Sequence, residues 1–171
     1  MLTRTRGFTL IEAMLVLALL ATLTSIATPA FARMINAQQL RAASIELATA
    51  LSMARHAAIA RRQPVLVDNG DGDWTSGWRV FVDHNGNGVH DGDEPILRQG
   101  ARTAVGVRIS GNTPVSRYVR YTPTGRAKLL GGAFQAGTIT LCHEDGQQQV
   151  RKLVLSASGR LRTLKEMAGS C

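Results

Sequence analysis

The chain has 171 residues and a formal charge of +8, with 20 lysines and arginines against 12 aspartates and glutamates. An apolar run near the N-terminus takes up about 25 residues, and the roughly 110 to 140 that remain suffice for one domain with a modest hydrophobic core. The sequence contains no Ser-His-Asp words, zinc-ligand spacing, phosphate-binding glycine loop or Cys-x-x-Cys motif. Without these motifs, the sequence gives no support for an enzyme.

The apolar run extends from Phe8 to Ala32 and holds one formal charge, on Glu12. Since a helix of about 20 residues crosses the hydrocarbon core of a membrane, the run is long enough to span it. Arg4 and Arg6 precede the run and should stay in the cytoplasm, which would place the rest of the chain outside. A secretory signal peptide cleaved near residues 28–30 and a plain membrane anchor are alternatives. Neither explains the carboxylate, which is costly in an apolar helix and therefore indicates a function.

The residues around this carboxylate, Arg6-Gly7-Phe8-Thr9-Leu10-Ile11-Glu12, resemble the class III leader of type IV prepilins. The resemblance implies that a membrane peptidase cuts between Gly7 and Phe8 and that the new amino group of Phe8 is methylated. It also implies that Glu12 pairs with the N-terminal amine of a neighbouring subunit during assembly. Such pairing is physically reasonable, because an unpaired ammonium or carboxylate is costly in lipid. The expected location is the bacterial inner membrane, with a single pass and a periplasmic C-terminal domain, and then a pilus or pseudopilus.

Beyond the apolar run, small and apolar residues recur at three- and four-residue spacing, which predicts that one helix continues to about Arg62. Pro64 then ends it. The stripe of the helix expected to pack against the sheet consists of Ile35, Leu40, Ala43, Leu47, Ala50, Leu51, Ala54, Ala58 and Ile59. The sequence pattern from Glu46 to Val65, which includes Ala54-Arg55, resembles that of the GspH/FimT family of minor pilins and pseudopilins.

After Pro64 the chain reads as short strands separated by Asn-Gly, Gly-Gly and Asp-Gly turns. The expected strands are 64–67, 77–82, 94–97, 105–110, 118–122, 137–142, 150–156 and 161–164. The predicted fold is α+β and pilin-like, with one long N-terminal helix whose second half packs against an antiparallel β-sheet domain. The predicted parts are a leader at 1–7, a membrane or filament-core helix at 8–32, an amphipathic helix at 33–63, and a β domain with a basic tail at 64–171.

An acidic segment, residues 83–94, fits the calcium-loop pattern D-x-[DN]-x-[DN]-G-x5-E. The pattern assigns side-chain or carbonyl oxygens of Asp83, Asn85, Asn87, Val89, Asp91 and Glu94 to a calcium ion. No helices flank the segment, so the alternative is a glycine- and asparagine-rich hairpin turn with solvated acids. We expect that no cofactor is required, with Ca²⁺ as the one candidate.

Charge is unevenly spread along the chain. Residues 66–97 hold seven acids and one base, whereas residues 98–171 hold twelve bases and three acids. The C-terminal words Gly159-Arg160-Leu161-Arg162 resemble the tail motif with which the FimT branch of the family holds DNA during natural transformation. In an extended strand Arg160 and Arg162 point to the same side, and a bend in the tail would let Lys165 join them.

Four further bases extend the expected patch: Arg126, Lys128, Arg151 and Lys152. Arginine forks suit phosphate oxygens, so binding should be independent of DNA sequence and sensitive to salt. The tail shows no aromatic platform for stacked bases, which favours double-stranded DNA. The alternative is an ordinary solvated strand.

The two cysteines, Cys142 and Cys171, are expected to form a disulfide outside the cytoplasm. The functional hypothesis is a minor type IV pilin that is cleaved by prepilin peptidase and joins a pilus through its helix. It would bind DNA for uptake, prime pilus assembly, or do both. The alternative is a pseudopilin of a type II secretion system, with a structural role in protein secretion. The expected partners are other pilins or pseudopilins, the peptidase, the inner membrane and double-stranded DNA.

Overall fold

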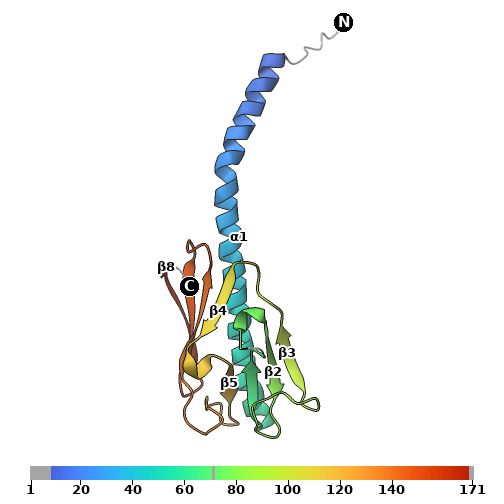
Figure 1. The fold of residues 1–171 in the computed structure, drawn as a ribbon, viewed down its shortest axis with the longest axis vertical. Coiled ribbons are helices and arrows are strands. Elements are labelled where there is room, and N and C mark those ends of the chain that lie inside the picture. The colour runs from blue at the N-terminus through green and yellow to red at the C-terminus, as the bar shows by residue number, and fades with distance from the viewer. Residues whose placement is uncertain (1–8, 71, 170–171) are drawn as a thin grey trace. The chain divides into compact units, whose positions relative to one another are not determined.

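The computed structural model describes residues 9–70 and 72–169. Its longest element is α1, a continuous helix over Leu10–Arg61 (Figure 1). The chain divides into two compact units at residue 35, and each is described by itself below. The first unit holds the apolar part of α1, and the second holds the rest of α1 and all the strands.

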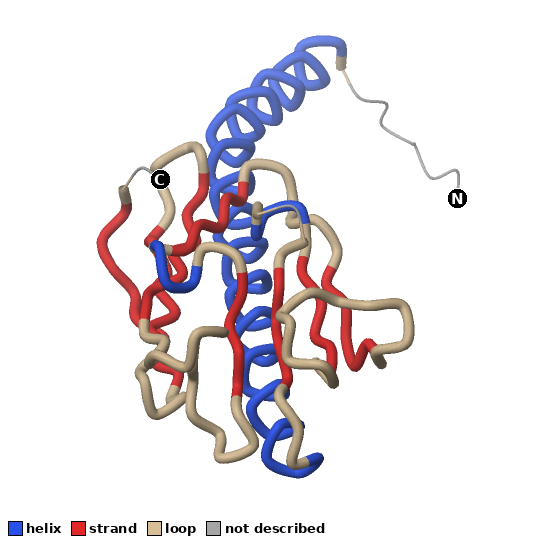
Figure 2. The backbone as a smooth tube through the Cα atoms, turned by 60° about the horizontal axis from the view of Figure 1, so that its bottom comes forward, coloured by secondary structure: helices blue, strands red, loops and turns tan. Residues whose placement is uncertain are grey.

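In the described part of the chain, eight strands follow α1 and form two four-stranded antiparallel sheets. The first sheet has the order β3-β2-β1-β5, and the second has the order β4-β6-β7-β8. The strands are β1 (Val65–Asp68), β2 (Trp78–Val82), β3 (Ile96–Gly100), β4 (Val107–Gly111), β5 (Tyr118–Tyr121), β6 (Gly137–His143), β7 (Gln149–Leu155) and β8 (Leu161–Ala168). Figure 2 shows the strands of the two sheets flanking the second half of α1.

One hydrophobic core joins the second half of α1 to both sheets. The helix contributes buried residues at three- and four-residue spacing, namely Leu40, Leu47, Ala50, Leu51, Ala54 and Ala58. Inward residues of the strands, such as Val80 and Leu141, are fully buried in the same core as these alanines. The predicted fold class, a long N-terminal helix packed on antiparallel strands, is confirmed.

All eight predicted strands are present, with boundaries that differ by up to four residues. The largest difference is at β8, which pairs with β7 well beyond its predicted end at residue 164. The predicted core face of the helix was wrong at its two ends, because Ile35 and Ile59 are 39% and 48% exposed. Ser44, which apolar spacing alone passes over, is buried instead.

Candidate functional site

The N-terminal part of α1 is an apolar surface that no other described residue of its own unit covers. Thr9 caps the helix, because its carbonyl accepts from the backbone N–H of Ala13 and its hydroxyl accepts from that of Glu12. Glu12 thus lies in the first helical turn, near the positive end of the helix dipole. Apolar side chains of the following turns are mostly exposed, for example Leu10 at 80% and Ile26 at 73%. Among the described residues, α1 is the one helix long and apolar enough to cross a membrane.

The predicted cleavage site, Gly7 and Phe8, lies outside the described residues. Cys142 is buried, and its expected partner Cys171 also lies outside the described residues. Cleavage, methylation and the disulfide therefore stay predictions. The assembly role of Glu12 likewise stays a prediction.

In the acidic loop, residues 83–94, side-chain oxygens accept hydrogen bonds from the loop's own backbone. The Glu94 carboxylate accepts from the backbone N–H groups of His84 and Asp91, at 2.8 and 3.1 Å. One oxygen of Asp91 accepts from the side-chain amides of both Asn85 and Asn87. The oxygens of these two asparagines in turn accept from backbone N–H groups two residues further on. These contacts tie the loop together through hydrogen bonds among its own residues.

Two of the six predicted calcium ligands are buried rather than presented to solvent. Asp83 is fully buried and Glu94 is 5% exposed. Asp83 accepts from the backbone of Gly86 with one oxygen, and its other oxygen lies 3.8 Å from Nε of Arg120. Within residues 9–70 and 72–169, no three His, Cys, Asp or Glu side chains are grouped so as to hold a metal. Calcium binding stays a prediction.

The basic tail begins as the turn of the β7–β8 hairpin. The N–H of Gly159 donates to the carbonyl of Ser156, and the N–H of Ser156 donates to the carbonyl of Arg160. Gly159 has a φ of +78°, which favours glycine, and a Cβ there would clash with the carbonyl oxygen of Gly125. Arg160 follows this turn directly and is exposed.

The strand that follows, β8, places two of the residues predicted to bind DNA on opposite faces. Arg162 lies opposite Val154 and Lys165 lies opposite Arg151, with regular pairing between these positions. Because side chains alternate along a strand, Arg162 and Lys165 are on opposite faces of β8. The expectation that a bend would bring Lys165 to Arg162 was therefore wrong, because β8 stays in regular pairing with β7 throughout this stretch.

Two other residues that were expected to extend the DNA-binding patch, Arg151 and Lys152, make contacts elsewhere. Lys152 forms an ion pair with Glu166, at 2.7 Å. Arg151 lines a recess between β7, β8 and α1 that also contains Ser52. There, desolvation by burial and the nearby charge of Arg41 lower the pKa of its guanidinium.

Arg55 of α1 joins the hairpin turn to a second turn, and sequence reasoning missed this role. Its Nε donates to the carbonyl of Gly125 at 2.9 Å, and its Nη2 donates to the carbonyl of Ser158 at 3.1 Å. The backbone N–H of Ala127 also donates to the carbonyl of Ala157. Arg55 belongs to the sequence pattern that resembles the family, but that pattern does not indicate which turns its side chain contacts.

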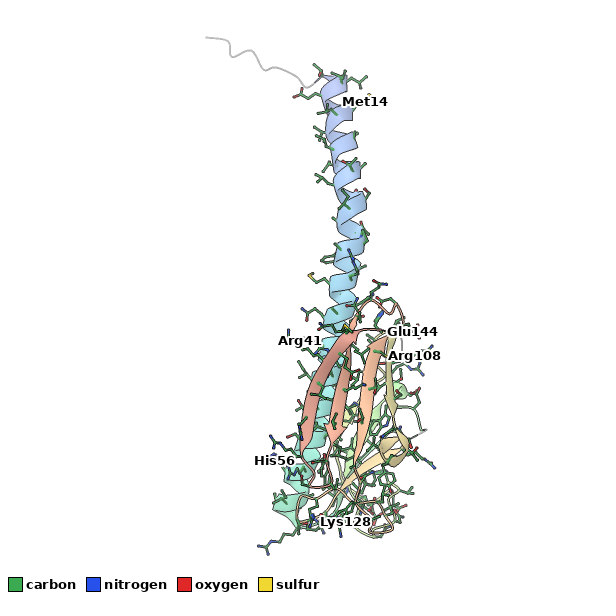
Figure 3. All side chains as sticks on the ribbon, turned by 90° about the vertical axis from the view of Figure 1, so that its left-hand side faces the viewer. Met14, Arg41, His56, Arg108, Lys128 and Glu144 are labelled. Atoms are coloured by element: carbon green, nitrogen blue, oxygen red, sulfur yellow. The ribbon has the colours of Figure 1, made fainter. Side chains whose placement is uncertain are left out.

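These contacts hold the two turns together, and we call the four cations that follow them in the chain, Arg126, Lys128, Arg160 and Arg162, the basic end. In Figure 3, Lys128 lies toward the end of the domain at which α1 terminates. Among the described residues, no carboxylate forms an ion pair with any of the four, whereas Arg108 elsewhere pairs with Glu144 at 2.6 Å. The basic end is thus a surface of unneutralised positive charge.

A family model described as "Type II transport protein GspH" matches residues 43–159, more than half of the chain. The chain belongs to this family. A second model, described as "Prokaryotic N-terminal methylation motif", matches residues 2–28. The GspH match includes Arg55 and Gly159 and ends immediately before Arg160. No curated protein matches the sequence significantly.

Two solved structures of pilin-like proteins share the fold. One is the type IV minor pilin FimU of Pseudomonas aeruginosa, at 22% identity and a TM-score of 0.57, covering 74% of this chain and 89% of that one. The other is the minor pseudopilin EpsH from the type 2 secretion system of Vibrio cholerae, at 12% identity and a TM-score of 0.56, covering 74% of this chain and 97% of that one. At these identities the similarity concerns the fold alone.

Proposed function

We propose that this GspH family member is a minor type IV pilin that enters a filament through the apolar part of α1 and binds double-stranded DNA at its basic end. The observation that carries the proposal is a set of four cations, none of which forms an ion pair among the described residues, beside two turns that Arg55 ties together. DNA phosphates attract such a surface without regard to base sequence. The DNA-binding role serves uptake in natural transformation, with or without a role in priming assembly.

The route into the filament follows from the N-terminal residues. Prepilin peptidase cleaves between Gly7 and Phe8, and the match to the methylation motif covers both residues. The C-terminal domain then lies on the periplasmic side of the inner membrane. Glu12, in the first turn of α1, meets the N-terminal amine of a neighbouring subunit. A Glu12→Gln variant should reach the membrane but be lost from purified filaments, whereas unchanged incorporation would refute this assembly role.

A type II secretion pseudopilin is the second candidate. The description of the matching family favours it, and EpsH is as similar in fold as FimU. Such a subunit has a structural role and does not need a surface for nucleic acid. The two candidates therefore differ in what the basic end does, which makes DNA binding the property to test.

The test is a titration of a labelled DNA duplex with the full chain, solubilised in a neutral detergent. Wild-type protein is compared with Arg160→Gln/Arg162→Gln and with the charge-matched control Arg102→Gln/Arg117→Gln, whose two arginines are exposed and lie outside the basic end. We expect binding that the tail variant weakens by at least about tenfold, as expected for two lost phosphate contacts, while the control stays close to wild type. No binding at low salt, or an equal loss in both variants, would refute the proposed DNA site and favour the pseudopilin.

A further inference from the structure

The structure places an exposed aromatic ring beside the basic end. Phe134 is 61% exposed, and the guanidinium of Arg126 lies over its ring, 5.1 Å from the ring centroid. Phe134 also pairs through its backbone with Lys128. The tail itself has no aromatic residue, so only the fold brings a ring to these cations.

The segment that presents Phe134 is held firmly. The next residue, Gln135, is fully buried and its side chain is fully hydrogen-bonded: it accepts from the N–H of Arg120 and donates to the carbonyls of Pro114 and Tyr118. Its backbone N–H donates to the carbonyl of Ala127. Phe134 therefore projects from a fixed backbone, and its exposure does not come from a loose loop.

We propose that Phe134, with Arg126 against its ring and Arg160 on the adjoining turn, is a stacking site for an unpaired base of single-stranded nucleic acid. A single strand alternates phosphates, which suit the arginines, with bases whose faces suit an exposed ring. A duplex keeps its bases stacked on one another and offers the ring nothing equivalent. The inference rests on the proposed DNA-binding function and names a second form of the ligand, single-stranded or locally opened DNA.

The experiment compares two probes, a labelled oligothymidylate and a labelled duplex of the same length, each titrated with the full chain in detergent. The variants are Phe134→Ala, the aromatic replacement Phe134→Tyr, and the control Val105→Ala, which trims another exposed apolar side chain, 95% exposed. We expect Phe134→Ala to weaken oligothymidylate binding by about fivefold to a hundredfold, the usual range for one stacked base. Duplex binding should change by less than about twofold, and Phe134→Tyr and Val105→Ala should bind both probes like wild type.

The contrary outcomes separate the two proposals. Duplex binding without oligothymidylate binding, or an equal effect of Phe134→Ala on both probes, overturns the stacking site and leaves the basic end as a duplex site. Absence of binding to either probe overturns the proposed function and the stacking site together. Loss of filament incorporation in Phe134→Ala with unchanged oligothymidylate binding also overturns the stacking site, because the ring would then serve a protein contact.

Discussion

The acidic loop and the basic end are both clusters of charge in the sequence, but their charged groups make different contacts in the folded chain. In the loop, Glu94 and Asp91 accept hydrogen bonds from nearby backbone and amide groups, and Asp83 is buried beside Arg120. At the basic end, the side chains of Arg160 and Arg162 have no ion-pair partner among the described residues. A cluster whose acids mostly bond within the loop stabilises a turn, whereas cations without an ion-pair partner are available to a polyanion.

The largest expected effect comes from replacing Gly159, on which the shape of the basic end depends. A valine there would meet the carbonyl of Gly125 and would need a backbone conformation with φ of +78°. We expect Gly159→Val to destabilise the domain by at least about 2 kcal/mol and to abolish duplex binding. Thermal unfolding of the full chain measures the first effect. Gly131→Val is the control, because a side chain at Gly131 has open space, and an equal loss in both variants would contradict the account.

Removing the side chain that joins the two turns should have the next largest effect. Arg55→Met takes charged donors away from the carbonyls of Gly125 and Ser158, which should cost about 1–2 kcal/mol of folding free energy. DNA affinity should fall as well, because the two turns would no longer be held together. Arg61→Met removes an exposed arginine of the same helix and serves as the control. Equal stability of the two variants would show that Arg55 does not hold the turns.

A smaller effect is expected from acid at Asp145, in the turn between β6 and β7. Burial alone would raise the pKa of this carboxyl, but hydrogen bonds from Gln147, Asn36, Gln148 and His143 outweigh it and lower the pKa to about 2. Since the folded pKa lies below the ordinary value of 3.8, the stability that Asp145 contributes is present above about pH 4 and is lost as the pH falls toward 2. Unfolding curves of wild type and Asp145→Asn should therefore converge over this range. A constant difference between them would contradict the lowered pKa.

The smallest effect should come from calcium. The acidic loop already closes through its own hydrogen bonds, so millimolar calcium or its removal by a chelator should shift the melting temperature by less than about 2 °C. Asp83→Asn provides a comparison in which the candidate site is weakened. A larger rise with calcium in wild type, absent from Asp83→Asn, would establish the loop as a calcium site and end its contrast with the basic end.

The long helix and the strands could be predicted because their signals are local. Apolar spacing from Leu40 to Ala58 marks the buried face of α1, and Asn-Gly and Gly-Gly pairs mark the turns. The candidate site was less accessible, because its members are brought together by tertiary contacts. Arg55 and Ser158 are 103 residues apart, and Phe134 is outside the tail motif. The face of Lys165 depends on the length of regular pairing between β7 and β8, which the words Gly-Arg-x-Arg do not specify.

The salt dependence of duplex binding tests the central claim, that the basic end contacts DNA phosphates, most directly. The logarithm of the binding constant falls linearly with the logarithm of the salt concentration, and each lost phosphate contact reduces the slope by about 1. The account predicts that Arg160→Gln/Arg162→Gln lowers the slope by about 2 and that Arg102→Gln/Arg117→Gln leaves it unchanged. Equal slopes for wild type and both variants would contradict the account, because the DNA would then be attracted by the net charge of the domain and not held at this end.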